Sequence, residues 1–387
     1  TLEDLSKVRT MMLLMTVNLA FTFPMSVFGS IIVAYEDFVF QKLVNITRII
    51  LNPLVMIAML MLGYRAIGMT VITTLFNVVT LLVNCWYCFH KIHIRIYFGH
   101  FKWGFLKEVS IYSFWIFLNA IMDRIYWSSG QFILGMYKGA VAVAVYAVAI
   151  QLQGIYMSFS TAISGVFLPK VTAMVAKENN EKAISDLFIR MGRIQYAIMA
   201  FILTGFILFG KVFIYFWAGS DYDEAYYIAL LFFIPLTIPL IQNLGIIILQ
   251  ARNQMRFRCV LYVVIAFVSL GISIPLARLY GGIGCALGTV FALVVGQIIA
   301  MNIYYHRRIH IDIVRFWKEI FRMSLVPILL GGVGYCFLNM ITLTNAWELG
   351  LAILLFSLIY VPLFWYMGLN GYEQSLFREP LKRLLKI

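Results

Sequence analysis

Two adjacent charged residues, Asp123 and Arg124, lie near the middle of an otherwise apolar run at 109–134. If this run crosses a membrane, a charge at its centre costs at least about 2.5–3.5 kcal/mol and needs a partner or water. Arginine stays protonated and offers a fork of N–H donors that fits phosphate oxygens. The pair therefore predicts either an anion-binding position in a cavity or an ion pair that fixes this segment to a neighbour.

Uncharged polar residues also interrupt the apolar runs, and in hydrocarbon such residues tend to face a cavity or another helix. We predict that they line a substrate path, with an ordinary interhelical hydrogen bond as the alternative for each one. Proline removes a backbone donor and clashes one turn back. Pro235 and Pro239 therefore predict a bend just before Gln242 and Asn243, which would open toward the path and be usable as a hinge. The residues are Asn119, Gln131, Gln151, Gln153, Gln242 and Asn243.

Motifs for enzymatic chemistry are weak. The run 205–211 (GFILFGK) resembles a phosphate loop, but Val212 replaces the required Ser or Thr. The C-x-x-C at Cys85 and Cys88 has no second pair and ends an apolar run. We therefore expect no catalytic residue, no metal and no cofactor, and we predict that the protein is not an enzyme.

The composition identifies the element that positions these residues. The chain has 387 residues, of which 63% are hydrophobic and 12% charged, and its mean hydropathy is +0.91. Soluble domains are about 45–50% apolar and about 25% charged. The sequence predicts an all-α fold, a polytopic transmembrane helix bundle. The net charge of +13 then indicates membrane topology and anionic lipid rather than nucleic acid.

Apolar runs long enough to span a bilayer need about 20 residues. Eleven stretches qualify: 10–34, 43–63, 67–89, 109–134, 139–166, 194–218, 226–250, 257–279, 282–305, 322–341 and 348–368. The segments on one side carry 23 of the 30 Lys and Arg residues, and those on the other side carry six. The positive-inside rule makes the basic side cytoplasmic, with Thr1 outside and Ile387 inside. We expect amphipathic cytoplasmic helices in 167–193 and 373–387.

An internal repeat relates residues 29–90 to residues 245–306 at an offset of 216. The matched pairs include Gly29 with Gly245, Tyr64 with Tyr280, Gly68 with Gly284, Thr73 with Thr289, and His90 with His306. One residue later, 92–94 (IHI) matches 309–311 (IHI). The copies are six spans apart and so share one orientation, which indicates a parallel repeat.

The repeat predicts three parts of the chain. Residues 1–107 form the second half of one six-helix lobe, 108–310 form a complete six-helix lobe, and 311–387 form two extra spans and a basic cytoplasmic tail. We expect that about 107 residues with three spans precede Thr1 in the intact protein, which would then have 14 helices. Within the complete lobe, the small residues of Gly284-x-x-x-Gly288 predict close helix packing.

The sequence resembles the multidrug/oligosaccharidyl-lipid/polysaccharide exporter superfamily, and within it the bacterial O-antigen and capsule oligosaccharide flippases. The likeness covers nearly the whole chain and rests on 23–36 (FPMSVFGSIIVAYE), 112–135 (YSFWIFLNAIMDRIYWSSGQFILG), 159–172 (FSTAISGVFLPKVT) and 280–284 (YGGIG). It implies transport of a polyprenyl-diphosphate-linked glycan across the bacterial cytoplasmic membrane, driven by an ion gradient or the membrane potential.

This resemblance gives the charged pair a role. We expect Arg124 to bind the diphosphate and Asp123 to hold it or to take part in ion coupling. The implied partners are the lipid-linked oligosaccharide, membrane lipids and other polysaccharide-assembly proteins. Three alternatives remain: a drug/cation antiporter of the same fold, a membrane-embedded glycan polymerase or ligase, and a non-transporting lipid-binding scaffold.

Overall fold

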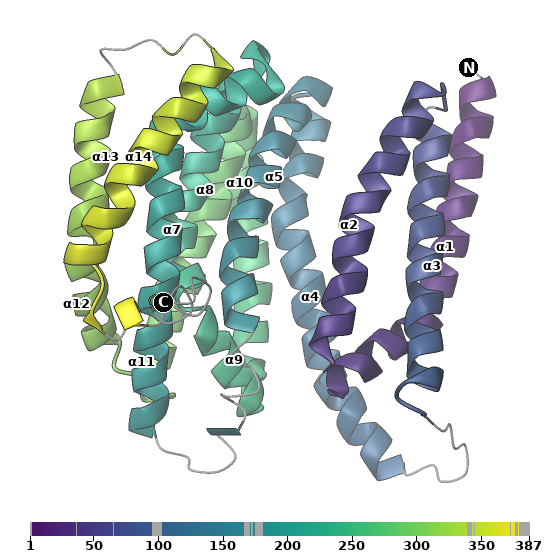
Figure 1. Ribbon diagram of the computed structural model, residues 1–387, viewed down its shortest axis with the longest axis horizontal. Helices are drawn as coiled ribbons and strands as arrows, with labels where there is room; N and C mark the ends of the chain where they lie inside the picture. The colour runs from purple at the N-terminus through teal and green to yellow at the C-terminus, as the bar shows by residue number, and fades with distance from the viewer. Residues whose placement is uncertain are drawn as a thin grey trace. The chain divides into compact units, whose positions relative to one another are not determined.

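The computed structural model describes residues 2–35, 37–64, 66–94, 103–165, 171, 173–174, 181–338, 343, 345–371, 373–375 and 378. Regular structure in these ranges is helical throughout (Figure 1). The chain forms two compact units, Thr1–Trp103 and Gly104–Ile387, which we call unit 1 and unit 2. The predicted all-α transmembrane bundle is confirmed.

Unit 1 is a bundle of three helices: α1 (Leu2–Ala34), α2 (Phe38–Met61) and α3 (Ala66–His90). The helix α1 packs along α3, and α2 packs on α3 as well. A polar contact joins α3 to α1. The Asn77 amide of α3 donates to Asn18 Oδ1 at 2.8 Å and to Thr22 Oγ1 at 2.7 Å, both on α1. These are interhelical hydrogen bonds of the kind that hold membrane helices together.

Unit 2 is centred on helices α5, α7, α8 and α10, and α13 and α14 pack on α7 (Figure 1). Its elements are α4 (Trp103–Tyr137), α5 (Ala140–Gly165), α7 (Glu181–Ala218), the 3-10 turn η1 (Ser220–Tyr222), α8 (Asp223–Ile241), α9 (Asn243–Ala251), α10 (Met255–Leu293), the π-helix η2 (Val294–Ala300), α11 (Met301–Arg307), α12 (Ile313–Met323), α13 (Leu325–Leu338) and α14 (Ala346–Met367).

The described residues contain ten helical stretches that are long and apolar enough to cross a membrane. One of them, Met255–Arg307, has 53 residues, which at about 1.5 Å per residue is far longer than a hydrocarbon core of about 30 Å. It is broken at Gly281, whose φ of 61° and ψ of −134° are not helical. Glycine adopts this conformation without a steric penalty. The stretch therefore makes two crossings, so its length agrees with the two separate spans predicted there.

The two arms that meet at Gly281 pack very closely. A Cβ atom on Gly284 would lie 2.0 Å from the Leu276 carbonyl oxygen, and one on Gly288 would lie 2.6 Å from the Ser273 backbone nitrogen. The small residues of the predicted G-x-x-x-G pattern thus serve packing inside unit 2.

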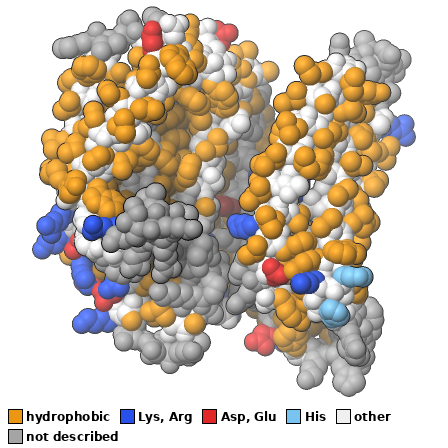
Figure 2. All heavy atoms as spheres, in the orientation of Figure 1, with side chains coloured by type: hydrophobic (Ala, Val, Ile, Leu, Met, Phe, Trp, Pro, Cys, Tyr) orange, Lys and Arg blue, Asp and Glu red, His pale blue; other side chains and the backbone are white. Residues whose placement is uncertain are grey.

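The surface agrees with a membrane environment. Large apolar side chains are exposed on both units, among them Phe23 at 72% and Phe132 at 74%. Figure 2 shows hydrophobic side chains covering the visible flanks, and Lys and Arg gathered toward one end of unit 2. Such an apolar flank would be unstable in water and is normal in lipid.

Equivalent turns occur in the two predicted repeat copies. His93 and His310 both have positive φ, 57° and 58°. In each turn the following isoleucine N–H bonds to a carbonyl six residues back, Ile94 to Cys88 at 3.2 Å and Ile311 to Tyr305 at 3.0 Å. A non-glycine residue with positive φ is uncommon, so two at matching positions favour the repeat, which remains a prediction.

The predicted cytoplasmic helices lie partly outside the described residues. Residues 181–193, expected within a separate cytoplasmic helix, instead continue directly into the span of α7. Most of the remaining loop, 166–170, 172 and 175–180, lies outside the described residues, as does nearly all of the predicted tail helix 373–387. The division into 1–107, 108–310 and 311–387 remains a prediction.

Orientation can be tested with single cysteines in a variant lacking the five native ones. We expect Lys182→Cys, on the exposed start of α7, to react with an impermeant maleimide only after the membrane is opened. Ser220→Cys, exposed at the other end of that helix, should react in intact cells. Labelling of Lys182→Cys from outside would reverse the predicted topology.

Candidate functional site

The inner face of α4 carries the first group of candidate residues. Asn119 and Asp123 are one helical turn apart and both are half-buried. The Trp115 carbonyl, one turn earlier, accepts a hydrogen bond from Cys259 Sγ at 3.3 Å, and the Tyr126 hydroxyl donates to the Thr289 carbonyl at 2.5 Å. This face of α4 therefore lies against α10, and Asn119 and Asp123 point into unit 2.

A buried arginine faces them from α10. Arg258 has only 8% of its surface exposed and lies near the start of α10. Its Nη2 donates to the Tyr262 hydroxyl at 2.8 Å, and its guanidinium carbon lies 4.5 Å from the centre of that ring. The guanidinium is thus held by an aromatic residue one turn along the same helix.

Asp123 lies on the face of α4 that contacts α10, and no salt bridge of 4.0 Å or less joins it to Arg258 in the described part of the chain. Successive positions on a helix are about 100° apart, so Asp123 and Arg124 point in different directions. Asp123 is half-buried whereas Arg124 is exposed, and the roles expected of both remain predictions.

A small cavity of about 20 Å³ lies beside Arg258. This volume is sufficient for one water molecule. The cavity lies where two helices are irregular: α8 gives way to α9 at Gln242, and the π-helix η2 contains Gln297. Its lining residues are Pro239, Gln242, Ile246, Arg258, Tyr262, Gln297, Met301 and Tyr305. Irregular helices around a buried charge are typical of the parts of transporters that change shape.

Both prolines lie inside the continuous helix α8, and the interruption comes three residues after the second of them, at Gln242. The Gln242 side chain is 2% exposed. It exchanges two hydrogen bonds with Asn302, of 2.9 and 3.2 Å. Its amide is therefore occupied by a protein partner, and whether the break acts as a hinge remains a prediction.

Asn243 belongs to a different polar contact. Its Nδ2 donates to Ser164 Oγ at 2.9 Å and to Ser160 Oγ at 3.4 Å. Gln195 donates to the same Ser160 hydroxyl at 3.3 Å. These bonds tie the start of α9 to α5 and α7, which is the interhelical hydrogen-bonding role that the sequence left open for such residues.

The remaining candidates point elsewhere. Arg124 and Gln151 are exposed, and Gln131 is half-buried. Gln153 is 3% exposed and donates to Met157 Sδ. The eight candidates are therefore not gathered in one contact. Gln242 lines the cavity beside Arg258, and Asn243 and Gln153 make local hydrogen bonds. The other candidates are half-buried (Asn119, Asp123 and Gln131) or exposed (Arg124 and Gln151).

A second buried arginine, Arg193 on α7, joins three elements. It donates from Nε and Nη2 to the two carboxylate oxygens of Glu373, at 2.5 and 2.9 Å. Its Nη1 donates to Glu319 on α12 at 2.6 Å, and its Nη2 also donates to the Gly368 carbonyl at 3.2 Å. Four hydrogen bonds leave the guanidinium, and this contact attaches the segment after α14 to the centre of unit 2.

The chain is similar to a known protein family and to a solved structure. A family model described as "Polysaccharide biosynthesis protein" matches residues 6–227. A search of curated proteins gives no match. A solved structure titled "Lipid II flippase MurJ, inward closed conformation" is similar with a TM-score of 0.65 and 18% identity, covering 92% of this chain and 74% of that chain. At this identity the likeness establishes a shared fold.

Proposed function

Because the chain belongs to the family of polysaccharide biosynthesis proteins, we propose that it is a flippase for polyprenyl-diphosphate-linked oligosaccharide. The transported lipid would supply a surface polysaccharide such as O-antigen, capsule or exopolysaccharide. The protein would lie in the bacterial cytoplasmic membrane with Ile387 on the cytoplasmic side. It would use an ion gradient or the membrane potential and would have no catalytic residues.

The observation that carries this proposal is the shared fold with a lipid flippase over 92% of the chain. The printed name of that protein refers to a lipid-linked molecule, and the family name refers to polysaccharide synthesis. A carrier of lipid-linked saccharide is the activity that satisfies both descriptions. The hydrogen bonds from Cys259 to the Trp115 carbonyl and from Tyr126 to the Thr289 carbonyl would then hold α4 against α10 during the transport cycle.

Arg124 supports the same function. It is exposed on α4, yet it lies within a helix that crosses the membrane. A charged side chain in a spanning helix faces a water-filled cavity or the bundle interior rather than lipid. We propose that Arg124 faces the transport path and binds the substrate diphosphate, with Gln151 as a second polar residue along that path.

The test is deletion of the intact gene in its native bacterium. We expect lipid-linked repeat units to accumulate in the inner leaflet, where a membrane-impermeant glycosidase added to intact spheroplasts cannot reach them. Surface polysaccharide should be lost and should return with a plasmid copy. Normal surface polysaccharide in a strain without a related transporter would refute the proposed function.

A further inference from the structure

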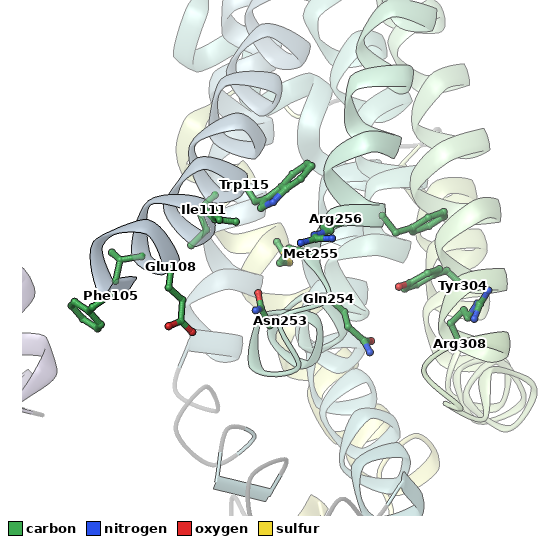
Figure 3. Close-up of a pocket in the computed structure, with 13 residues that line it drawn as sticks. Phe105, Glu108, Ile111, Trp115, Asn253, Gln254, Met255, Arg256, Tyr304 and Arg308 are labelled. Atoms are coloured by element: carbon green, nitrogen blue, oxygen red, sulfur yellow. The ribbon is translucent and has the colours of Figure 1, made fainter. Parts of the chain in front are cut away.

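A large groove lies in unit 2 between the first turns of α4 and the neighbouring ends of α10 and α11. Its volume is about 1010 Å³, which is at the upper end of the usual range for ligand sites of about 300–1,000 Å³. Figure 3 shows α4 on one side of the groove and α10 with α11 on the other, and Trp115 and Arg256 extend toward each other across it. None of the eight residues predicted from the sequence lines it.

Two arginines make one part of the groove cationic. Arg256 comes from the first turn of α10, and Arg308 comes from the residue that ends α11. Both side chains are exposed, and neither has a carboxylate partner among the described residues. The Arg256 guanidinium lies 6.0 Å from the centre of the Trp115 ring. Free guanidinium groups are suited to bind phosphate oxygens through paired hydrogen bonds.

Aromatic faces and uncharged polar groups make up the next part. The rings of Phe257 and Tyr304 are stacked with centres 4.1 Å apart and an angle of 4°, which fixes the orientation of this wall. Asn253 and Gln254 lie at the turn before α10. Ring faces pack against the C–H faces of sugars, and side-chain amides exchange hydrogen bonds with sugar hydroxyls. This combination favours a saccharide over a plain phospholipid head group.

Glu108 on α4 also lines the groove. Its carboxylate would repel a second anionic group, and it can accept hydrogen bonds from hydroxyls. A ligand that is anionic at one end and rich in hydroxyls at the other satisfies both arginines and Glu108. The rim on α4 is apolar and exposed, with Phe105 at 68% and Val109 at 41%, and so can contact a hydrocarbon chain.

We propose that this groove is a docking site for the head group of a lipid-linked saccharide, outside the path that contains Arg124. Arg256 and Arg308 bind the diphosphate, Trp115 and Tyr304 contact the first sugar, and the prenyl chain runs along α4 into the bilayer. The groove lies at the end where α4 begins, the cytoplasmic end in the predicted topology, and thus on the side where such lipids are made. This assignment rests on the proposed function.

The experiment measures ligand binding to the full chain in phosphatidylcholine nanodiscs by native mass spectrometry. The probes are farnesyl diphosphate, farnesyl diphosphate linked to N-acetylglucosamine, and phosphatidylglycerol. The test variants are Arg256→Gln with Arg308→Gln, and Trp115→Leu. Arg278→Gln is the matched control, because Arg278 also lies over an aromatic ring, 4.4 Å from the centre of Tyr137, at the opposite end of α4.

We expect the double arginine variant to weaken binding of both diphosphate probes at the groove at least about tenfold, while the site at Arg124 still binds one molecule, since hydrogen bonds to charged groups are lost only at the groove. Trp115→Leu should remove only the extra affinity that the sugar gives. The Arg278→Gln variant should bind like wild type. Equal binding by the double variant and the control would overturn the docking site while leaving the flippase proposal intact.

Two other outcomes are also decisive. If phosphatidylglycerol displaces the sugar-bearing probe at equal concentration, the groove is a general site for anionic phospholipid and the proposal fails. If wild type binds neither diphosphate probe, the proposed function itself is contradicted, together with the docking site.

Discussion

An Arg124→Lys variant should reach the membrane in normal amounts and yet flip lipid-linked saccharide at least about tenfold more slowly. Lysine keeps the charge but replaces the planar fork with a single ammonium group, so paired hydrogen bonds to a diphosphate are lost. The rate can be measured in proteoliposomes as the appearance of probe in the outer leaflet. Arg278→Lys, outside the proposed path, is the control and should be unaffected.

The lysine and alanine variants of Arg124 together distinguish a role as a ligand from a role as a structural anchor. If Arg124 serves only to fix α4, the lysine variant should transport nearly normally, and Arg124→Ala should be lost from the membrane. If Arg124 is a ligand, Arg124→Ala should insert and fail to transport. A stably inserted Arg124→Ala protein with full transport would eliminate both roles.

Arg193→Ala should produce the largest loss of stability of any single substitution proposed for this protein. The change leaves Glu373, which is 1% exposed, without its bidentate partner. Removing one member of a buried ion pair costs about 3–5 kcal/mol. We expect a markedly lower thermal unfolding temperature in detergent, together with early protease cleavage after α14 because the Glu373 attachment is lost.

The control for that experiment is Arg315→Ala. Arg315 donates to Asp186 at 2.7 Å, but its side chain is 55% exposed. Exposed pairs contribute about 0–1 kcal/mol, so the unfolding temperature should scarcely change. Equal effects of the two substitutions would show that the Arg193 contact is not a buried attachment.

The helices could be predicted because the bilayer imposes a length and a composition on each crossing. The break at Gln242 follows Pro235 and Pro239 closely, but both prolines lie inside α8, so they indicated the neighbourhood of the break and not its position. The reversal at Gly281 also follows from local sequence, because only two residues separate the predicted spans 257–279 and 282–305 and one of them is a glycine. All of these features depend on a few adjacent residues, so they are visible in one sequence.

The buried charges could not be predicted in the same way. Arg258 follows Arg252 and Arg256 and so has the composition of a cytoplasmic loop. Its burial depends on a tertiary approach of residues distant in the chain, such as Pro239 and Tyr305, that no local pattern records. Arg193 and Glu373 were missed for the same reason. The groove beside Trp115 is also formed by segments distant in sequence.

The π-helix at Val294–Ala300 lies where the two predicted repeat copies keep the same register. Val79 matches Val295 and His90 matches His306 at one offset of 216, and the extra residue enters only between His306 and His310. The corresponding helix α3 is α-helical throughout, so two segments of equal length differ here in their hydrogen bonding and not in their residue count. If the halves arose by duplication, their pseudosymmetry is broken at Gln297, beside Arg258, and only the copy in unit 2 carries the wide turn.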